Sequence, residues 1–509
     1  MDLTKLNFKE NFQLFKSALN QSDFIAIDAE FSGLYNKLKL NPLDEFGDRY
    51  EILRKNLKQY VLLQVGICCF ELLTPGEYKC YPFNFNIFPY SHEQSKDFNT
   101  AFLCDSNTLT FLADNKFDFN KVIYSGIPYI SMMNLKSLIR QTKPLLSPTP
   151  TPALSRELEL INRCIYSQIG EHEHTKERVL STEEPILSAD QPDLELTADT
   201  NETESNFDNL VIMTSFNQIL QLVSQSNKRT VFHNGFLDLF HIMNQFYGPL
   251  PEKWDDFKSM VHSFFPKIFD TKYLACIDPF RDHIDQSSLA TVYELFSAKF
   301  PLNITFPPQF DRYTPGGIEY KHEAGYDAMM TGHIFGSMLL LGVKIDKFVN
   351  EIFLGMQGVF HFSPTKRDIR PQRDNVLHFS TKSPRDKISK EEITDLLSPF
   401  TRVNNFWYHN NSVFVMLQKS LRKVDLLNFR TSCVHTKYHI MSYEEYYNAK
   451  RKIGYYEPEP NTKRNKNSVN KQQQTPKFHS KYSVESSNGN KSVNTDTQTV
   501  FPNVDDWDP

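Results

Sequence analysis

Apolar positions follow two different spacings along the first part of the chain. Between residues 6 and 19 they recur at three- and four-residue intervals, which predicts an amphipathic helix. Runs of strand type follow at 24–31, 61–72 and 79–88. The nearly all-apolar run 61–72 is typical of a central strand, whereas the alternation in 79–88 is typical of an edge strand. Strands and helices within one globular unit predict an α/β fold.

The pattern breaks off in the middle of the chain. Prolines crowd residues 143–152, and proline is excluded from the interiors of helices and sheets. A short amphipathic helix is predicted at 156–169. From 171 to 208, twelve Asp/Glu stand against two Lys/Arg, a composition typical of disorder. We therefore predict one α/β domain built from residues 1–142 and 209–365, interrupted by a Pro-rich and acidic insert at 143–208.

A second, smaller domain is predicted at residues 370–450. Strand patterns at 376–380, 403–408, 412–418 and 438–443 are combined with helix patterns at 390–397 and 420–429. This βαββαβ order is the layout of an RNA-recognition fold. Residues 451–509 are rich in Asn, Gln, Ser and Lys and poor in apolar side chains, which predicts a disordered basic tail.

Composition and charge narrow the classes of function. The 509 residues are 40% hydrophobic, as expected of a globular protein with a sizeable core. The net charge of −5 argues against a global basic field, so any nucleic-acid site must be a local patch. Seven cysteines without a C-x-x-C spacing argue against a disulfide framework and a zinc knuckle. With no signal-peptide pattern and no apolar run of transmembrane length, we expect no membrane partner.

Two carboxylates interrupt the apolar run at 24–31. Residues two apart on a strand project from the same face, so Asp28 and Glu30 point the same way. Buried and unpaired, both charges would be costly. A cation between them removes that cost, and carboxylate oxygens suit Mg²⁺ or Mn²⁺. A polar strand end in solvent, or a salt bridge to a distant Lys or Arg, is the alternative.

Two later segments carry further acids beside histidines. In H-N-G-F-L-D-L, Asn234 and Asp238 share one helical face if a helix opens there, although Asn as an ordinary helix cap is the alternative. In H-E-A-G-Y-D, Gly325 is expected to allow a tight turn between His322 and an apolar helix that Asp327 enters. Taken singly, each segment is ambiguous.

The order of these acids resembles the DEDD exonuclease superfamily in its histidine variant. The segments F-I-A-I-D-A-E-F-S-G-L, K-F-D-F-N-K-V-I-Y-S-G-I-P-Y, F-P-K-I-F-D-T-K-Y and H-E-A-G-Y-D-A resemble the poly(A)-specific ribonucleases, which are CAF1-type deadenylases. The resemblance covers about residues 7–143, 209–343 and 370–452. It implies an RNase H-like DEDD exonuclease domain with a mixed sheet and flanking helices, beside the βαββαβ RNA-recognition-like domain.

The resemblance also implies roles for particular residues. The metal ligands would be Asp28, Glu30, Asp238 and Asp327, which together would hold two Mg²⁺ ions, with Mn²⁺ as a possible substitute. Asp28 is expected to bridge both ions. His322 is implied as the general base, since its unperturbed pKa suits proton transfer near neutral pH.

Substrate contacts are implied in both domains. Phe31, Leu34 and Lys272 are expected along the path of the terminal adenylates, with plain core packing as the alternative for Phe31 and Leu34. Asp270, in the same D-T-K segment as Lys272, is expected to be a hydrogen-bonding support. Trp407 is implied to stack on the 5′ cap, although a tryptophan on a strand usually packs.

The function implied is that of a Mg²⁺-dependent 3′-to-5′ exoribonuclease that shortens poly(A) tails and releases 5′-AMP. Two alternatives stay open: a trimmer of small-RNA 3′ ends of the piRNA-precursor type, and a non-catalytic RNA-binding scaffold. The expected partners are single-stranded RNA 3′ ends, poly(A) and the 5′ cap. A homodimer is implied by the same resemblance. Residence in nucleus and cytoplasm is expected, with the K-R-N-K cluster at 463–466 as a candidate part of a nuclear import signal, although such clusters are common in disordered tails. The acidic insert stands where the family carries an extra nucleic-acid-binding domain, so weaker poly(A) affinity is expected.

Overall fold

The computed structural model describes residues 1–34, 40–89, 101–131, 134, 215–284, 286–314, 320–356, 359–369, 373–409 and 411–452. The chain divides into two compact units near residue 371, and each is described by itself. The predicted insert at 143–208, the helix at 156–169 and the tail beyond residue 452 lie outside the described residues. Within the described part, no helix is long and apolar enough to cross a membrane.

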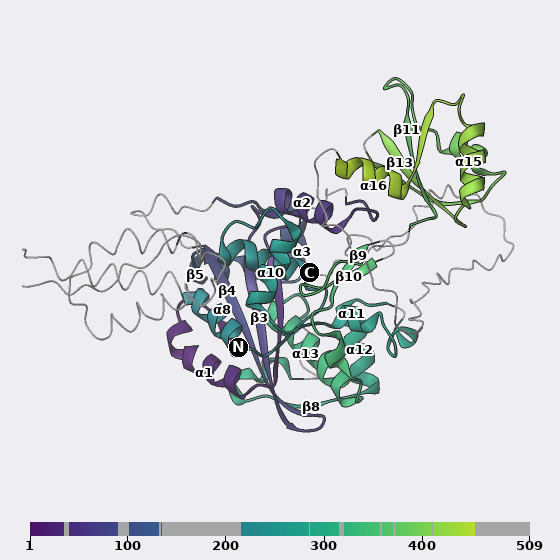
Figure 1. Cartoon of the computed structure of the whole chain (residues 1–509). Coiled ribbons are helices and arrows are strands. Elements are labelled where there is room, and N and C mark those ends of the chain that lie inside the picture. The colour runs from purple at the N-terminus through teal and green to yellow at the C-terminus, as the bar shows by residue number, and fades with distance from the viewer. Residues whose placement is uncertain are drawn as a thin grey trace, which may run out of the picture. The chain divides into compact units, whose positions relative to one another are not determined.

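The first unit is built on one mixed sheet, as the sequence predicted (Figure 1). Its main path runs β1-β4-β3-β2-β6-β7, with β5 and β8 also pairing with β4. The pairs β2–β3 and β3–β4 are antiparallel and the remaining pairs are parallel. The strands are β1 (Asp2–Leu3), β2 (Phe24–Phe31), β3 (Leu62–Thr74), β4 (Glu77–Pro89), β5 (Ile127–Tyr129), β6 (Arg229–Phe232), β7 (Ile268–Asp270) and β8 (Asn303–Thr305).

The edge position expected for residues 79–88 is wrong. Strand β4 lies inside the sheet, between β3 on one side and β1, β5 and β8 on the other. The alternation suggested that the polar side chains face solvent. Asn84 and Asn86 are each only 1% exposed, however, and they form hydrogen bonds with other protein groups. In this strand the alternating polar residues are therefore buried amides and do not form a solvent-facing side of the sheet.

Helices cover both faces of this sheet. Side chains alternate along β2, so that Ile25 and Ile27 enter one core and Phe24 and Ala26 the other. The first core is closed by α1 (Phe8–Gln21), α2 (Phe46–Leu57), α8 (Ser215–Ser226), α9 (Phe236–Ile242) with its π-helical continuation Met243–Tyr247, and α10 (Trp254–Phe264). The second is closed by α11 (Thr271–Ala275), α12 (Leu289–Lys299) and α13 (Ala324–Leu340), which lie together on the other side in Figure 1.

Shorter elements complete the first unit. A satellite cluster forms around α3 (Ser106–Asp114) and α4 (Phe119–Ser125). Strands β9 (Ile352–Met356) and β10 (Val359–Phe362) make a separate two-stranded sheet. The 3₁₀ helices among the described residues are η4 (Arg281–His283), η5 (Pro308–Tyr313) and η6 (Ile345–Phe348). Of these, η5 becomes important because it lies against β4 and shortly precedes α13 in the chain.

The second unit has the predicted βαββαβ order. Its elements are β11 (Val376–Thr381), α14 (Lys390–Leu397), β12 (Val403–His409), β13 (Ser412–Leu417), α15 (Lys423–Ser432) and β14 (Tyr438–Ser442), and the strand order is β12-β13-β11-β14. A further helix that the sequence analysis missed, α16 (Tyr443–Lys452), follows. The ring of Tyr446 on α16 lies 4.2 Å from that of His378 and 5.0 Å from that of Phe414. Helix α16 therefore packs against the sheet face that carries Phe414.

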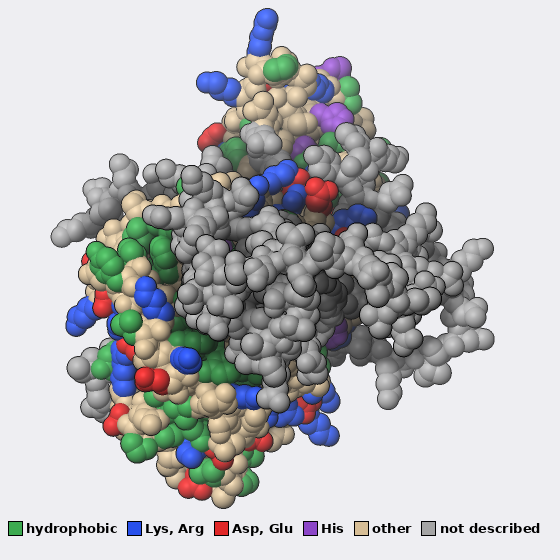
Figure 2. Space-filling view, turned by 90° about the vertical axis from the view of Figure 1, so that its left-hand side faces the viewer, with side chains coloured by type: hydrophobic (Ala, Val, Ile, Leu, Met, Phe, Trp, Pro, Cys, Tyr) green, Lys and Arg blue, Asp and Glu red, His purple; other side chains and the backbone are tan. Residues whose placement is uncertain are grey.

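Charge is distributed unevenly between the two units. Residues 373–452 contain fourteen Lys/Arg and eight Asp/Glu, whereas the whole chain has a net charge of −5. The surface visible in Figure 2 mixes basic and acidic side chains without a large region of one sign. The described part of the second unit therefore carries more basic than acidic side chains.

Candidate active site

Strand β2 directs Asp28 and Glu30 toward helix α13. Both share the strand face of Phe24 and Ala26, which pack in the core that α13 closes. Gly66 on β3 stands opposite Asp28 in the antiparallel pair. A Cβ at Gly66 would lie 1.9 Å from the carbonyl oxygen of Ala324, so only glycine lets the first turn of α13 approach the sheet this closely.

Helix α13 supplies the next acid, immediately after an unusual backbone turn. Asp327 lies in its first turn and is 2% exposed. His322 precedes the helix with φ of +65°, in the left-handed region that costs a non-glycine residue free energy. Its backbone N–H donates a 3.1 Å hydrogen bond to Oδ2 of Asp327. The Asp327 carboxylate thus helps to hold the conformation of His322.

The role expected of Gly325 is wrong. Gly325 lies inside α13, and the left-handed residue of the turn is His322. Glycine is needed at 325 for a different reason, since a Cβ there would lie 2.9 Å from Cβ of Asn84. Close packing of the helix against β4, rather than backbone freedom, therefore explains this glycine.

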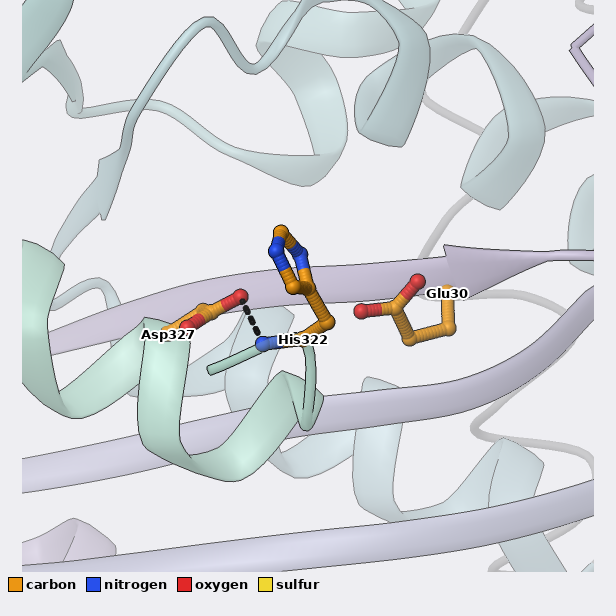
Figure 3. Close-up of side chains that lie close together, drawn as sticks. All are labelled: Glu30, His322 and Asp327. Atoms are coloured by element: carbon orange, nitrogen blue, oxygen red, sulfur yellow. Dashed lines mark hydrogen bonds between the residues drawn. The ribbon is translucent and has the colours of Figure 1, made fainter. Parts of the chain in front are cut away.

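Three of the predicted catalytic side chains lie close together. Glu30, His322 and Asp327 each offer a ligand atom, and these atoms all lie within 4.8 Å of one another. Figure 3 shows His322 between the carboxylate of Glu30, from β2, and that of Asp327, from α13. The ring of Phe111 on α3 meets the His322 ring edge-on, with centroids 4.6 Å apart. The site therefore combines a strand, a helix and a neighbouring aromatic side chain.

Helix α9 brings the fourth acid. Asp238 lies in the first turn of α9 and is 8% exposed. The helix begins only at Phe236, after Gly235 at the N-cap, and Asn234 precedes it with φ of +63°. Neither interpretation of Asn234 from sequence is correct. Asn234 lies in the turn before α9, so it does not share a helical face with Asp238, and the N-cap is Gly235.

The electrostatics of these acids indicate a cation site. Burial, followed by repulsion from Asp327, Asp238 and Glu30, raises the pKa of Asp28 well above its ordinary value. Burial and the charges of Asp327 and Asp238 do the same to the pKa of Glu30. Burial also raises the pKa of Asp238 to about 7. Such repulsion between buried carboxylates is relieved by a bound cation.

Hydrogen bonding supports the same interpretation. Among the described residues, Oδ2 of Asp28 and both carboxylate oxygens of Glu30 are buried without a hydrogen-bond partner. Buried oxygen atoms of this kind are rare unless they serve an ion or a water. Carboxylates are a donor set that suits Mg²⁺ or Mn²⁺. Glu30 and Asp327 stand in the close group with His322, whereas Asp28 and Asp238 lie outside that group and are related to it through the repulsion of their charges. The four-ligand set stays a prediction.

Asp270 is the hydrogen-bonding support that the sequence suggested. Its carboxylate, 1% exposed, accepts five backbone N–H bonds of 2.9–3.3 Å. The donors come from three segments and are Asn234, Gly235, Lys272, Tyr273 and Phe353. One buried carboxylate therefore ties the turn before α9, which leads to Asp238, to the start of α11 and to β9.

The expected substrate residues of the first unit have different surroundings. Phe31 is 3% exposed and packs in the core on the opposite sheet face from Asp28 and Glu30, with its ring 5.0 Å from that of His241. Leu34 is partly buried against the same core. Lys272 is 7% exposed, and its Nζ lies 5.2 Å above the ring of Phe353. These positions favour core packing for Phe31.

Trp407 lies in β12 of the second unit. It is 8% exposed and stands opposite Phe414 in the β12–β13 pair. The neighbouring Tyr408 is 58% exposed. This burial favours a packing role for Trp407, and cap binding stays a prediction.

Several polar residues around the turn of His322 escaped the sequence analysis. The backbone N–H of Ala324 donates to Oε1 of Gln64, and that of Gly325 donates to Oδ1 of Asn84, both at 3.0 Å. Glu323 accepts bonds from Asn84, Arg312 and Tyr313. The available signal was the F-N-F-N run of β4, which places amides in a strand that is otherwise apolar.

Comparison with known proteins found a matching family model, relatives in sequence and similar solved structures. A family model described as "CAF1 family ribonuclease" matches residues 3–335. The chain is 28% identical over 528 residues to "Poly(A)-specific ribonuclease PARN" of Bos taurus, covering 89% of this chain and 81% of that protein. It is 26% identical over 464 residues to "Pre-piRNA 3'-exonuclease trimmer" of Bombyx mori, covering 79% and 86%. Among solved structures, "Structure of S. pombe Pop2p - Mg2+ and Mn2+ bound form" matches with a TM-score of 0.39 and 15% identity, covering 70% of this chain and 98% of that chain.

Proposed function

This chain belongs to the CAF1 family of ribonucleases, and from that premise we propose that it is a 3′-to-5′ exoribonuclease that shortens poly(A) tails and releases 5′-AMP. The observation that carries the proposal is the group of the buried acids Glu30 and Asp327 with His322, whose ligand atoms lie within 4.8 Å of one another. The similarity to poly(A)-specific ribonucleases over most of the chain supports poly(A) as the substrate. A non-catalytic scaffold would have no need of this group.

The chemistry assigns each residue a task. Asp28, Glu30, Asp238 and Asp327 would hold two Mg²⁺ ions, which when bound supply Lewis-acid stabilisation of the attacking and leaving oxygens. His322 would take the proton of the attacking water at a ring nitrogen, within reach of the acids. The Phe111 ring limits how far the imidazole can turn. The Asp327 carboxylate would thus serve both as a ligand and as an acceptor for the His322 backbone N–H.

RNA would be bound mainly through phosphates. Lys272, placed by the Asp270 hydrogen bonds to its segment, is proposed to meet a phosphate near the 3′ end. The basic excess of residues 373–452 would attract RNA phosphates. Cap stacking by Trp407 and the homodimer stay predictions from the resemblance, and residence in nucleus and cytoplasm stays a prediction from the sequence.

The test uses two 5′-labelled RNAs of equal length, one ending in oligo(A) and one in mixed sequence. With Mg²⁺, we expect stepwise loss of single 5′-AMP units from the oligo(A) end and a stall after the A-tract. Asp28→Asn keeps the size of the side chain but lacks the charge, and we expect it to be inactive. The proposal is wrong if the wild-type protein leaves both RNAs intact in Mg²⁺ and in Mn²⁺.

A second candidate function uses the same site on a different RNA. The similarity to a pre-piRNA 3′-exonuclease of Bombyx mori favours trimming of small-RNA 3′ ends. Equal shortening of the oligo(A) and mixed-sequence RNAs would support the trimmer and argue against adenylate selectivity.

A further inference from the structure

Glu323, the residue that follows His322, is held by a network of polar side chains. Its carboxylate accepts 2.8 Å hydrogen bonds from the Tyr313 hydroxyl and from Nδ2 of Asn84, and it forms an ion pair with Arg312. The carboxylate of Glu323 is thereby surrounded by donors on η5 and on β4. Its side chain is 15% exposed, so these partners rather than water satisfy it.

Asp2 closes this network into a ring. Nδ2 of Asn84 also donates to Asp2, at 2.9 Å, and Nη1 of Arg312 lies 3.0 Å from the Asp2 carboxylate. The guanidinium of Arg312 further stacks over the ring of Tyr320, 4.4 Å from its centroid. Asp2 and Glu323 each contact both Asn84 and Arg312, which closes the ring. The ring joins β1, β4, η5 and the turn before α13.

Strands β3 and β4 also hold the first backbone groups of α13. A helix start leaves N–H donors without partners inside the helix, and Glu323 at the N-cap gives no side-chain cap. Gln64 and Asn84 supply the acceptors for Ala324 and Gly325 instead. The turn that presents His322 is therefore bonded to the sheet both through the backbone N–H groups of Ala324 and Gly325 and through the side chain of Glu323.

We propose that Glu323, held by Arg312 and Asn84, is a positioning residue for His322, an inference that rests on the proposed nuclease function. His322 has φ of +65°, a conformation that persists only where the surroundings impose it. Asp327 holds the turn from the helix side through the His322 N–H. The Glu323 network holds it from the sheet side. Without that network the turn relaxes toward an ordinary backbone conformation, and the imidazole leaves its place between Glu30 and Asp327.

The kinetic test compares Glu323→Gln, Arg312→Met and Arg312→Lys with a matched control. Asp368→Asn is the control. Asp368 also accepts hydrogen bonds from two partly buried donors, Trp254 Nε1 and Lys258 Nζ, but these donors lie on α10, which covers the other face of the sheet. We expect Glu323→Gln and Arg312→Met to lower kcat by about 10- to 100-fold with KM for oligo(A) changed less than about twofold. Arg312→Lys should restore most of kcat, and the control should leave it unchanged.

A second readout does not depend on activity. The ¹³Cε1 resonance of His322, assigned with His322→Gln in histidine-labelled protein, is expected to move in Glu323→Gln and to stay in Asp368→Asn. The rise in Tm caused by Mg²⁺ should persist in Glu323→Gln, since all four acids remain. Equal kcat in Glu323→Gln and the control, or an unmoved His322 resonance, overturns the inference. If the wild-type protein shortens no RNA, the proposed function fails, and the resonance alone still decides the positioning role.

Discussion

The backbone N–H of His322 donates a 3.1 Å hydrogen bond to Oδ2 of Asp327. The proposed general base is therefore bonded directly to a proposed metal ligand. The ligand atoms of both residues also lie within 4.8 Å of Glu30. Substitutions at the two positions should nevertheless separate proton transfer from metal binding, because only one of the two side chains is proposed to hold the ion.

His322→Gln is expected to lower kcat by about 100- to 10,000-fold, the usual contribution of a general base, while the rise in Tm caused by Mg²⁺ is retained. Asp327→Asn should abolish both activity and much of the Mg²⁺-dependent rise. The measurement is single-turnover RNA shortening beside thermal unfolding with and without Mg²⁺. Loss of the Tm rise in His322→Gln would instead make the imidazole a metal ligand.

The acidic group should make the stability of the metal-free protein depend on pH. Folding raises the pKa of Asp28 and Glu30, and that of Asp238 to about 7, so the folded state binds more protons than the unfolded state above the ordinary carboxyl range. The free energy of unfolding in EDTA should therefore fall as pH rises from about 4 to about 7. Mg²⁺ at about 100 times its Kd should restore about 2.7 kcal/mol.

Thermal unfolding across this pH range, in EDTA and in Mg²⁺, measures both effects. The double variant Asp28→Asn/Glu30→Gln lacks the repelling charges and should show a flatter pH dependence in EDTA. Identical slopes for the wild-type protein in EDTA and in Mg²⁺ would contradict a cation site at these carboxylates.

Gly66→Ala should displace the start of α13. The new Cβ would lie 1.9 Å from the carbonyl oxygen of Ala324, which requires the helix to move. We expect a loss of about 1–3 kcal/mol in the free energy of unfolding, typical of overpacking, together with reduced RNA shortening. Gly355→Ala is the control, since its nearest neighbour would be the Phe353 ring at 3.5 Å, an ordinary contact. Equal stability and activity in both variants would be the contrary result.

Asp270→Ala should destabilise the protein more than the loss of any one bond. Five backbone donors lose their acceptor, and each buried donor left without a partner costs about 1–3 kcal/mol, so we expect at least about 3 kcal/mol. Activity measured well below Tm should also fall, because the turn that leads to Asp238 is released. Asp346→Ala, which removes an exposed ion pair with Arg229, should change stability by less than about 1 kcal/mol. Denaturant unfolding of the two variants makes the comparison.

Trp407→Ala should act mainly on the stability of the second unit. Trp407 is 8% exposed, so its loss leaves a cavity, and we expect a cost of about 3–5 kcal/mol. Tyr408→Ala, at a 58% exposed position beside it, should cost less than about 0.5 kcal/mol. Chemical unfolding and binding of 7-methyl-GTP are measured for both. Lost cap-analogue binding in Trp407→Ala at unchanged stability would favour the stacking role.

The sequence by itself determined the features that depend on local geometry. A strand places residues two apart on one face, so the shared face of Asp28 and Glu30 followed from the spacing alone. The βαββαβ order of the second unit followed from the strand and helix patterns of its segments, which are also local. Asp270 as a support was likewise recognisable beside Lys272, since a carboxylate that precedes a short helix can accept its first N–H groups.

Only the tertiary structure decided what depends on distant partners. The network around Glu323 joins Asp2, Asn84 and Arg312, which lie in separate parts of the chain, and no local pattern indicates which donors will meet one carboxylate. The inner position of β4 depended on strands added from elsewhere. The burial of Phe31 and Trp407 depended on which elements cover each face. Pairing and coverage arise from packing across the whole chain, so the spacing of residues along the sequence cannot determine them.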